Sequence, residues 1–243
     1  MLDIIMDFGK MDILILLAMI PSIIIGFIIY KKDVIEKEPT LLLIKLFAIG
    51  ALSTGVALFF EIYIEKFFIF FEKIVFLNIF IKSFIIIGFC EEFVKWFFTY
   101  IICWKQKDFN YTYDAIVYTV FISLGFATIE NIIAILSDNG GVLLAIQRGL
   151  ITVPAHAFFG IISGYYLGIS KKYEARGWHK KYKKNIILSI ILPILVHGVF
   201  DFLLFSSTKI SFVVAIMFIL YLYYFSYIKI SKVSKETKEI IKQ

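Results

Sequence analysis

Long apolar runs separated by short polar stretches dominate this sequence. A helix needs about 20 consecutive apolar residues to cross a membrane, because the hydrocarbon core is roughly 30 Å thick. The pattern therefore predicts an all-α protein, a polytopic transmembrane helical bundle of about seven spans. The predicted spans are residues 13–30, 41–60, 83–103, 113–136, 142–169, 185–205 and 210–227.

One segment, residues 62–82, fits neither a span nor a polar loop. It is strongly aromatic, yet Glu65, Lys66, Glu72 and Lys73 interrupt it. Aromatic residues mixed with charged ones are typical of an amphipathic helix that lies in the membrane interface. We predict such an interfacial helix here, with a short additional span as the alternative.

Basic residues are concentrated after the first, third and fifth predicted spans and in the C-terminal segment. Because loops rich in Lys and Arg stay in the cytoplasm, this predicts an N-terminus outside and a C-terminus inside. The first dozen residues carry three aspartates and one lysine, whereas a cleavable signal begins with a basic region, so none is expected. The predicted organisation is a membrane domain over residues 1–228 and a basic cytoplasmic tail over residues 229–243.

Composition excludes a soluble protein. Of the 243 residues, 60% are hydrophobic, and the mean hydropathy is +0.89, which is more apolar surface than a soluble domain can bury. The net charge of +6 does not indicate nucleic-acid binding, because the basic residues lie in separate loops rather than on one face. Cys90 and Cys103 lie roughly 20 Å apart on one predicted helix, so we expect two reduced cysteines that contribute to packing.

Ionisable side chains inside the predicted spans are costly to keep in hydrocarbon and by default mark a functional site. The third span contains Glu91, Glu92 and Lys95. Glu91 and Lys95 are four residues apart and share a helix face, whereas Glu92 is turned by about 100° from Glu91. Lys95 can therefore neutralise one carboxylate while the other points at a different partner. A purely structural ion pair, the alternative, would leave one acid unexplained.

The fourth span contributes Glu130, which follows Phe126 by one helical turn, and the adjacent Asn131. Glu130 is a candidate site residue, unless it only extends toward the outer interface. Asn131 is more typical of a hydrogen bond between helices than of a ligand. Asp114, near the start of this span, is expected to cap the helix.

The fifth span places His156 at the head of a four-residue spacing of small residues, Gly160, Gly164 and Gly168. This seam predicts close packing against another helix, so His156 faces protein rather than lipid. A histidine that only bonds a neighbouring helix is the alternative. Arg148, earlier in the span, is expected to be a counter-charge or an interface anchor.

The sixth span contains His197 and Asp201, again four residues apart on one helix face. The carboxylate can fix the tautomer of the imidazole, or both groups can converge on one ligand; a purely structural pair is the alternative. His179 lies in a basic loop and is expected to be solvated. If the acids of the spans cluster around Lys95 and Arg148, the excess negative charge requires bound protons or a divalent cation. No Ser, Cys or Thr stands beside these histidines, so no covalent nucleophile is expected.

The order of these motifs resembles the PrsW family of intramembrane proteases. Glu91-Glu92-x-x-Lys95, Phe126-x-x-x-Glu130 and His197-x-x-x-Asp201 are similar to the EExxxR, FxxxH and HxxxN/D motifs of the wider CAAX-protease and bacteriocin-processing superfamily. The acidic loop 33–39, which ends in Pro39, and the helix of His156 also resemble elements of the family. The resemblance covers nearly the whole chain.

The resemblance implies a protease of the prokaryotic plasma membrane that cuts a single-pass membrane protein, such as an anti-sigma factor, on the extracytoplasmic side. In its glutamic scheme Glu91 activates water, Glu92 supports it, and Lys95 replaces the usual Arg. Glu130 then orients water, and His197 with Asp201 stabilises the oxyanion. A zinc site formed by His156, His197 and Glu130, with Glu91 as the base, is the competing scheme.

Two other functions remain open from the sequence. A proton- or cation-coupled transporter also uses Glu, His and Asp inside a membrane, although no internal repeat is visible. A scaffold that binds membrane helices through its glycine seam would leave the buried acids unexplained.

Overall fold

The computed structural model describes residues 8–137, 141–235 and 240, and this part of the chain contains helices and no strand. The prediction of an all-α bundle is confirmed. The α-helices are α1 (Phe8–Lys32), α2 (Thr40–Phe68), α3 (Val75–Ile81), α4 (Phe89–Cys103), α5 (Thr112–Ser137), α6 (Gly141–Ala175), α7 (His179–Phe205) and α8 (Lys209–Val233). A 3₁₀ turn, η1 (Ile69–Phe71), follows α2, and a π-helix, η2 (Lys82–Gly88), joins α3 to α4.

Six helices in the described part are long and apolar enough to cross a membrane, namely α1, α2 with η1, and α5 to α8. The third predicted span, residues 83–103, is also helical, but η2 and α4 build it together, and α3 directly precedes it. None of these three elements alone has the length of a span, and α4 carries the charged residues Glu91, Glu92 and Lys95. The stretch formed by α3, η2 and α4 therefore differs most from an ordinary membrane-spanning helix, and it carries the candidate site residues of α4.

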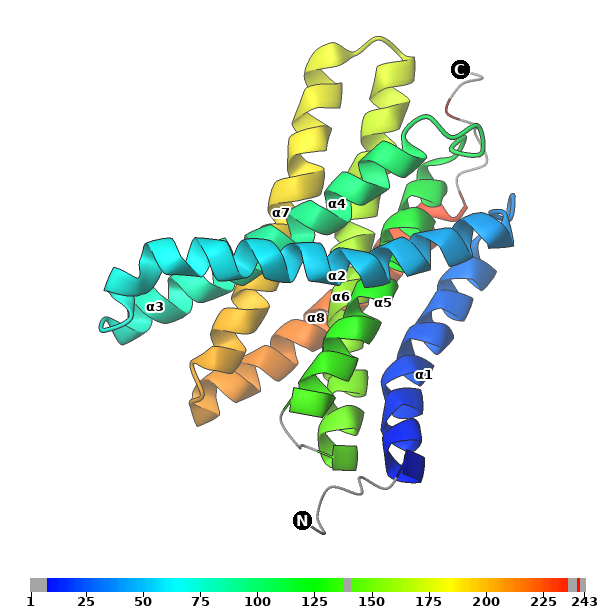
Figure 1. The fold of residues 1–243 in the computed structure, drawn as a ribbon. Coiled ribbons are helices and arrows are strands. Elements are labelled where there is room, and N and C mark those ends of the chain that lie inside the picture. The colour runs from blue at the N-terminus through cyan, green and yellow to red at the C-terminus, as the bar shows by residue number, and fades with distance from the viewer. Residues whose placement is uncertain (1–7, 138–140, 236–239, 241–243) are drawn as a thin grey trace.

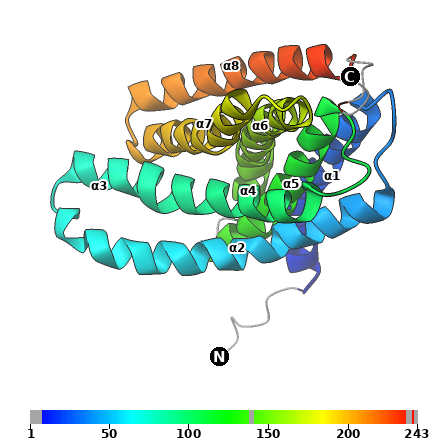
Figure 2. The same ribbon diagram turned by 90° about the horizontal axis from the view of Figure 1, so that it is seen from above.

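Residues 62–82 differ from the prediction, because no single interfacial helix covers them: the end of α2, η1 and α3 divide the segment. Helix α2 continues past residue 60 to Phe68, and η1 leads into α3, which runs back along α2 (Figure 2). Glu and Lys are good helix formers, so charged residues at this point do not end a helix. Glu65 and Lys66 are exposed on its surface, whereas Glu61 is partly buried.

The C-terminal segment also differs from a simple charged tail. Helix α8 extends to Val233, past the boundary expected at residue 228. Ile240 is buried, and its backbone N–H donates to the carbonyl oxygen of Asn110 at 2.7 Å. At least this residue therefore packs on the bundle.

Helix α5 is the most buried of the membrane-spanning helices. Figure 2 shows α2 and α8 on opposite outer faces, with α5 and α6 between them. The glycines of α5 and α2 bring these two helices into backbone contact: a Cβ on Gly50 would collide with the carbonyl oxygen of Ile122, and one on Gly125 with that of Phe47.

The glycine seam of α6 packs against α5, as predicted. A Cβ on Gly164 would lie 2.6 Å from the carbonyl oxygen of Ala115, and one on Gly160 would lie 2.8 Å from Ser123 Oγ. Thr119 completes the seam, since its hydroxyl donates to the carbonyl oxygen of Gly160 at 2.8 Å. This contact fixes the position of His156, one turn before Gly160, relative to α5.

The loops rich in Lys and Arg lie toward one end of the bundle. Figure 1 shows the α1–α2, α4–α5 and α6–α7 connections in its upper half, and the N-terminal end of α1 at the bottom. The backbone contact between Asn110 and Ile240 joins the C-terminal segment to the same end. The fold therefore places the Lys- and Arg-rich connections and the C-terminal segment at the same end of the bundle, as the charge pattern predicts.

Replacing Gly50 with Ala is expected to destabilise the protein by about 1–3 kcal/mol, because the new methyl group would overlap the backbone of Ile122 on α5. Gly55→Ala on the same helix is the matched control, since a Cβ there meets nothing within 4 Å. Unfolding in denaturing detergent, followed by circular dichroism, measures both. Equal stability of the two variants would contradict the contact.

Candidate active site

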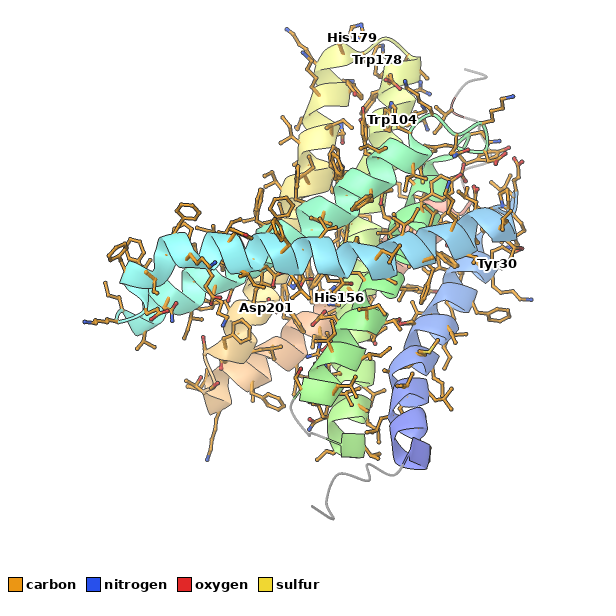
Figure 3. The ribbon with its side chains drawn as sticks, viewed as in Figure 1. Tyr30, Trp104, His156, Trp178, His179 and Asp201 are labelled. Carbon is orange, nitrogen blue, oxygen red and sulfur yellow. The ribbon has the colours of Figure 1, made fainter. Side chains whose placement is uncertain are left out.

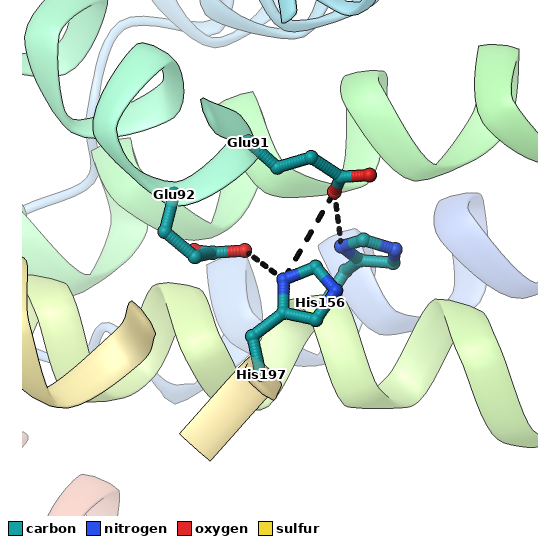
Figure 4. A group of neighbouring side chains, drawn as sticks. All are labelled: Glu91, Glu92, His156 and His197. Atoms are coloured by element: carbon teal, nitrogen blue, oxygen red, sulfur yellow. Dashed lines mark hydrogen bonds and ion pairs between the residues drawn. The ribbon is translucent and has the colours of Figure 1, made fainter. Parts of the chain in front are cut away.

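The side chains singled out from the third, fifth and sixth predicted spans meet inside the bundle. Glu91 and Glu92 come from α4, His156 from α6 and His197 from α7, and all four are buried. One ligand atom of each lies within 4.8 Å of those of the others. Figure 4 shows the two carboxylates turned toward the two imidazoles.

Lys95 is at the centre of this cluster. Its Nζ lies 3.0 Å from Glu91 Oε2, 2.8 Å from Glu92 Oε1 and 2.9 Å from His156 Nδ1. The same ammonium lies 4.0 Å from the ring centroid of Phe126, which adds a cation–π attraction. Sequence spacing predicted that Lys95 would neutralise one of the two acids; in the structure it binds both, and a histidine as well.

The local fold explains how α4 presents two consecutive acids to the same partners. The cluster follows directly after η2, and π-helical turns are frequent at functional sites. Where η2 meets α7 there is no room for side chains: a Cβ on Gly88 would lie 3.2 Å from the carbonyl oxygen of Ile194, and one on Gly198 would collide with Phe84. This close crossing brings the start of α4 up to His197.

The hydrogen bonds of His156 define its tautomer. Because the Lys95 ammonium can only donate, His156 Nδ1 accepts, so the proton of a neutral ring is on Nε2. His156 Nε2 lies 2.7 Å from Glu130 Oε2. Glu130 is therefore part of the cluster, as a partner of His156, rather than a residue that extends to the interface.

Arg148 and Asn131 hold Glu130 in place. Arg148 donates from a terminal nitrogen to Glu130 Oε1, and from Nε to Asn131 Oδ1 at 2.8 Å. The expectation that Arg148 is a counter-charge is met, with Glu130 as its partner. The side chains of Glu130 and Arg148 are 28% and 21% exposed, against 4% for Lys95, so this side of the cluster is the more open one.

His197 lies between two carboxylates. Its Nδ1 is 2.9 Å from Glu92 Oε1, and its Nε2 is 3.4 Å from Asp201 Oδ2. The ring stacks on Phe159 with 4.6 Å between the centroids. Since both nitrogens face acceptors, this arrangement favours an imidazolium that donates on both sides. Asp201 thus acts on the cluster through His197; Figure 3 labels both Asp201 and His156 within the bundle.

Sequence reasoning missed Glu61 on α2. Its carboxylate interacts electrostatically with Glu130, His197, Lys95 and Asp201. Its Oε1 is buried and has no hydrogen-bond partner among the described residues. Glu61 lies just past residue 60, where the predicted second span ends, and the continuation of α2 to Phe68 brings it to the site. A fifth acid increases the excess of negative charge.

Several other sequence predictions concern residues outside the cluster. Cys90 and Cys103 are buried and free. Asp114 accepts the backbone N–H groups of Asn110 and Tyr111, at 2.9 and 2.6 Å, and so caps the start of α5. His179 is exposed, as expected.

The donor set has the chemistry of a zinc site but not the space for an ion. Two imidazoles and two carboxylates suit zinc, which binds nitrogen and oxygen ligands at about 2.0–2.2 Å. Lys95 Nζ, however, lies within 3.0 Å of three of the four donors, and a metal at their centre would have to displace it. The predicted ligand Glu130 is not in this group, because it binds the far nitrogen of His156. With Lys95 in this position the residues do not fit a metal.

Comparison with known proteins identifies the chain. The family model described as "PrsW family intramembrane metalloprotease" matches residues 38–228. The chain belongs to the PrsW family. As a member it is a protease and a multi-pass membrane protein, which favours the protease hypothesis over a transporter.

Individual relatives align with most of the chain. The Protease PrsW of Clostridioides difficile (strain 630) is 37% identical over 213 residues, which cover 86% of each protein. That of Oceanobacillus iheyensis is 39% identical over 77% of this chain and 81% of the relative. That of Bacillus subtilis (strain 168) is 35% identical over 76% and 79%, respectively. No solved structure matches the chain.

Replacing Lys95 with Met is expected to destabilise the protein by about 3–5 kcal/mol, because it leaves Glu91 and Glu92 buried without their counter-charge. Lys82→Met is the control: its ion pair with Glu65 is 3.9 Å long and about half exposed, so its loss should cost less than about 1 kcal/mol. Unfolding in denaturing detergent compares them. A small, equal loss in both variants would rule out the central role of Lys95.

Proposed function

We propose that the protein is an intramembrane endopeptidase that hydrolyses a peptide bond of a membrane-anchored protein with water activated by Glu91. The observation that carries this proposal is the buried cluster of Glu91, Glu92, Lys95, His156 and His197, drawn from three helices. Ionisable groups are expensive inside a membrane and are kept there for function. Membership of a family of intramembrane proteases supports the same reaction.

The contacts of the two acids favour Glu91 as the base. Glu92 Oε1 is held by Lys95 at 2.8 Å and by His197 at 2.9 Å. Glu91 has one such contact, Lys95 at 3.0 Å, and both imidazoles are 4.0 Å away. All contacts of Glu91 with described residues use Oε2, which leaves Oε1 to accept a hydrogen bond from water. Glu91 is thus the acid that can take a proton with the least disruption.

The proton transfer itself prepares a group for the oxyanion. When Glu91 takes a proton from water, the hydroxide adds to the substrate carbonyl and a negative charge develops on its oxygen. Neutral Glu91 holds the Lys95 ammonium less strongly, so one N–H of Lys95 becomes available to this oxygen. Glu91 then passes its proton to the leaving amine, as a general acid. Glu92 and Asp201 hold His197 in place, and Glu130 with Arg148 holds His156.

The position of the more exposed side of the cluster, at Glu130 and Arg148, supports a class of substrate. Glu130 lies near the end of α5 and Arg148 near the start of α6, away from the basic loops. By the distribution of Lys and Arg, that end faces outward and the C-terminal end faces the cytoplasm. We propose that a single-pass membrane protein, of the anti-sigma-factor kind, enters from the extracytoplasmic half of the plasma membrane.

Glu91→Gln is expected to lower the rate of cleavage of a membrane-tethered substrate by at least about 100-fold, because an amide cannot act as the base. The protein is reconstituted with the substrate in vesicles, and cleavage is followed on gels. Glu65→Gln, an exposed acid of α2, is the control and should retain wild-type activity. Thermal unfolding shows whether each variant is folded. Wild-type activity in folded Glu91→Gln would exclude this residue as the base.

Elemental analysis separates the glutamic scheme from a metalloprotease. Because Lys95 occupies the centre of the donor group, we expect purified, active protein to contain much less than one zinc per chain. Cleavage should continue after treatment with a chelator. Stoichiometric zinc that is lost together with activity, and that restores activity when returned, would overturn the scheme.

A further inference from the structure

A second cluster of acids lies at the end of the bundle that carries the basic loops. Asp33 and Glu38 come from the connection between α1 and α2, and Asp114 comes from the first turn of α5. One carboxylate oxygen of each lies within 4.8 Å of the others. Along α5, Asp114 precedes Glu130 by sixteen residues, or roughly 24 Å. The cluster is therefore separate from the candidate active site.

These three acids are buried to a degree that is unusual for carboxylates. Asp33 and Glu38 are each 4% exposed, and Asp114 is 1% exposed. Asp33 Oδ2 is buried and has no hydrogen-bond partner among the described residues. An unpaired, buried carboxylate oxygen costs free energy unless something binds it. The orphan oxygen thus points to a ligand that completes the cluster.

The nearest basic side chain does not provide that partner. Lys37 Nζ donates to backbone carbonyl oxygens, those of Tyr30, Lys31 and Asp33, at the end of α1. Other contacts leave room for a ligand: Tyr118 donates to Glu38 Oε2 at 2.7 Å, and both backbone bonds of Asp114 use Oδ2. Asp33 Oδ2 therefore remains the buried oxygen of this cluster without a partner among the described residues.

We propose that Asp33, Glu38 and Asp114 form a binding site for a hard divalent cation, Ca²⁺ or Mg²⁺, that ties the α1–α2 loop to the start of α5. Carboxylate oxygens are the ligands that both ions prefer, and no soft ligand is present in the group. The ion brings the positive charge that Lys37 does not supply. Its binding fastens the loop that precedes α2, the helix that carries Glu61.

Burial of the loop acids disfavours their ionised forms, and a bound cation would offset that cost. Burial raises the pKa of Glu38 to about 9, and the neighbouring Asp114 raises it further. Burial also raises the pKa of Asp33 to about 6, although Lys37 opposes this effect. Glu38 and Asp114 are close enough to share a hydrogen bond. A proton shared by these two acids is therefore the alternative to a bound cation.

Thermal unfolding tests the proposal on the full-length protein in detergent, stripped with a chelator and exchanged into metal-free buffer at pH 7.5. CaCl₂ and MgCl₂ are added separately, with NaCl at equal ionic strength as the reference. A ligand that binds only the folded state should raise the midpoint by roughly 5–10 °C at about 100 times its Kd. The shift should saturate. No shift with either ion, or the same shift with NaCl, would overturn the proposal.

Three variants locate the ion. Asp33→Asn should abolish the shift, whereas Glu36→Gln, an exposed acid of the same loop that bonds Asn110 at 2.9 Å, should retain it. Glu91→Gln should also retain it, because that residue belongs to the other cluster. A shift lost in Glu91→Gln and kept in Asp33→Asn would assign the ion to the candidate active site and refute the proposal.

Terbium luminescence keeps the test decisive if Asp33→Asn does not fold. Tb³⁺ is a hard cation that nearby aromatic rings sensitise, and Tyr118 bonds directly to Glu38. The wild-type protein should show saturable luminescence at about one ion per chain, which Ca²⁺ removes by competition. Absence of saturable, Ca²⁺-sensitive binding in the wild-type protein would reject the site without any variant.

Discussion

The requirement to keep acids ionised inside a membrane bundle governs this structure, and the ammonium of Lys95 meets it. Glu91 and Glu92 are buried on consecutive positions of α4, where two unpaired charges would be prohibitive. Lys95 contacts both within 3.0 Å, and the face of Phe126 covers it. The other charged groups are arranged around this one. His197 contacts the same Oε1 of Glu92 that accepts from Lys95. Glu130 contacts Nε2 of His156, whose Nδ1 accepts from Lys95.

Close packing of helices at glycines, which have no side chain, makes this arrangement possible. Membrane helices gain little from the hydrophobic effect among themselves, so they associate through close backbone contact at small residues. Gly50 and Gly125 join α2 to α5, and the seam from Gly160 joins α6 to α5. Gly198 lets α7 approach η2 beside the first acid. Each of these contacts sets the distance between two helices that carry site residues, so the cluster depends on glycines that take no part in its chemistry.

The sequence predicted the helices and the main members of the cluster, because both follow from local patterns. Apolar length gives the spans, and a four-residue spacing puts His197 near Asp201. What depends on the fold was not predictable: Lys95 contacts His156 on another helix, and Glu61 reaches the site only because α2 continues past the charged residues that suggested its end. Residues 62–82 were misassigned for the same reason, since composition does not show where a helix turns. The acids Asp33, Glu38 and Asp114 meet through loop geometry, which no spacing in the sequence reveals.

The geometry also explains why lysine suits this position better than arginine. A lysine ammonium has three N–H donors that diverge from one point, and in this cluster three acceptors surround it, Glu91, Glu92 and the neutral nitrogen of His156. A guanidinium is a planar fork that matches one carboxylate edge-on, so it could not serve three acceptors that converge on a single atom. A divalent metal would also fit a convergent set, but it would bring twice the charge and require the ammonium to leave. Within this set of contacts, Lys95 is the counter-charge of the two acids and, in the proposed mechanism, the donor that the reaction releases.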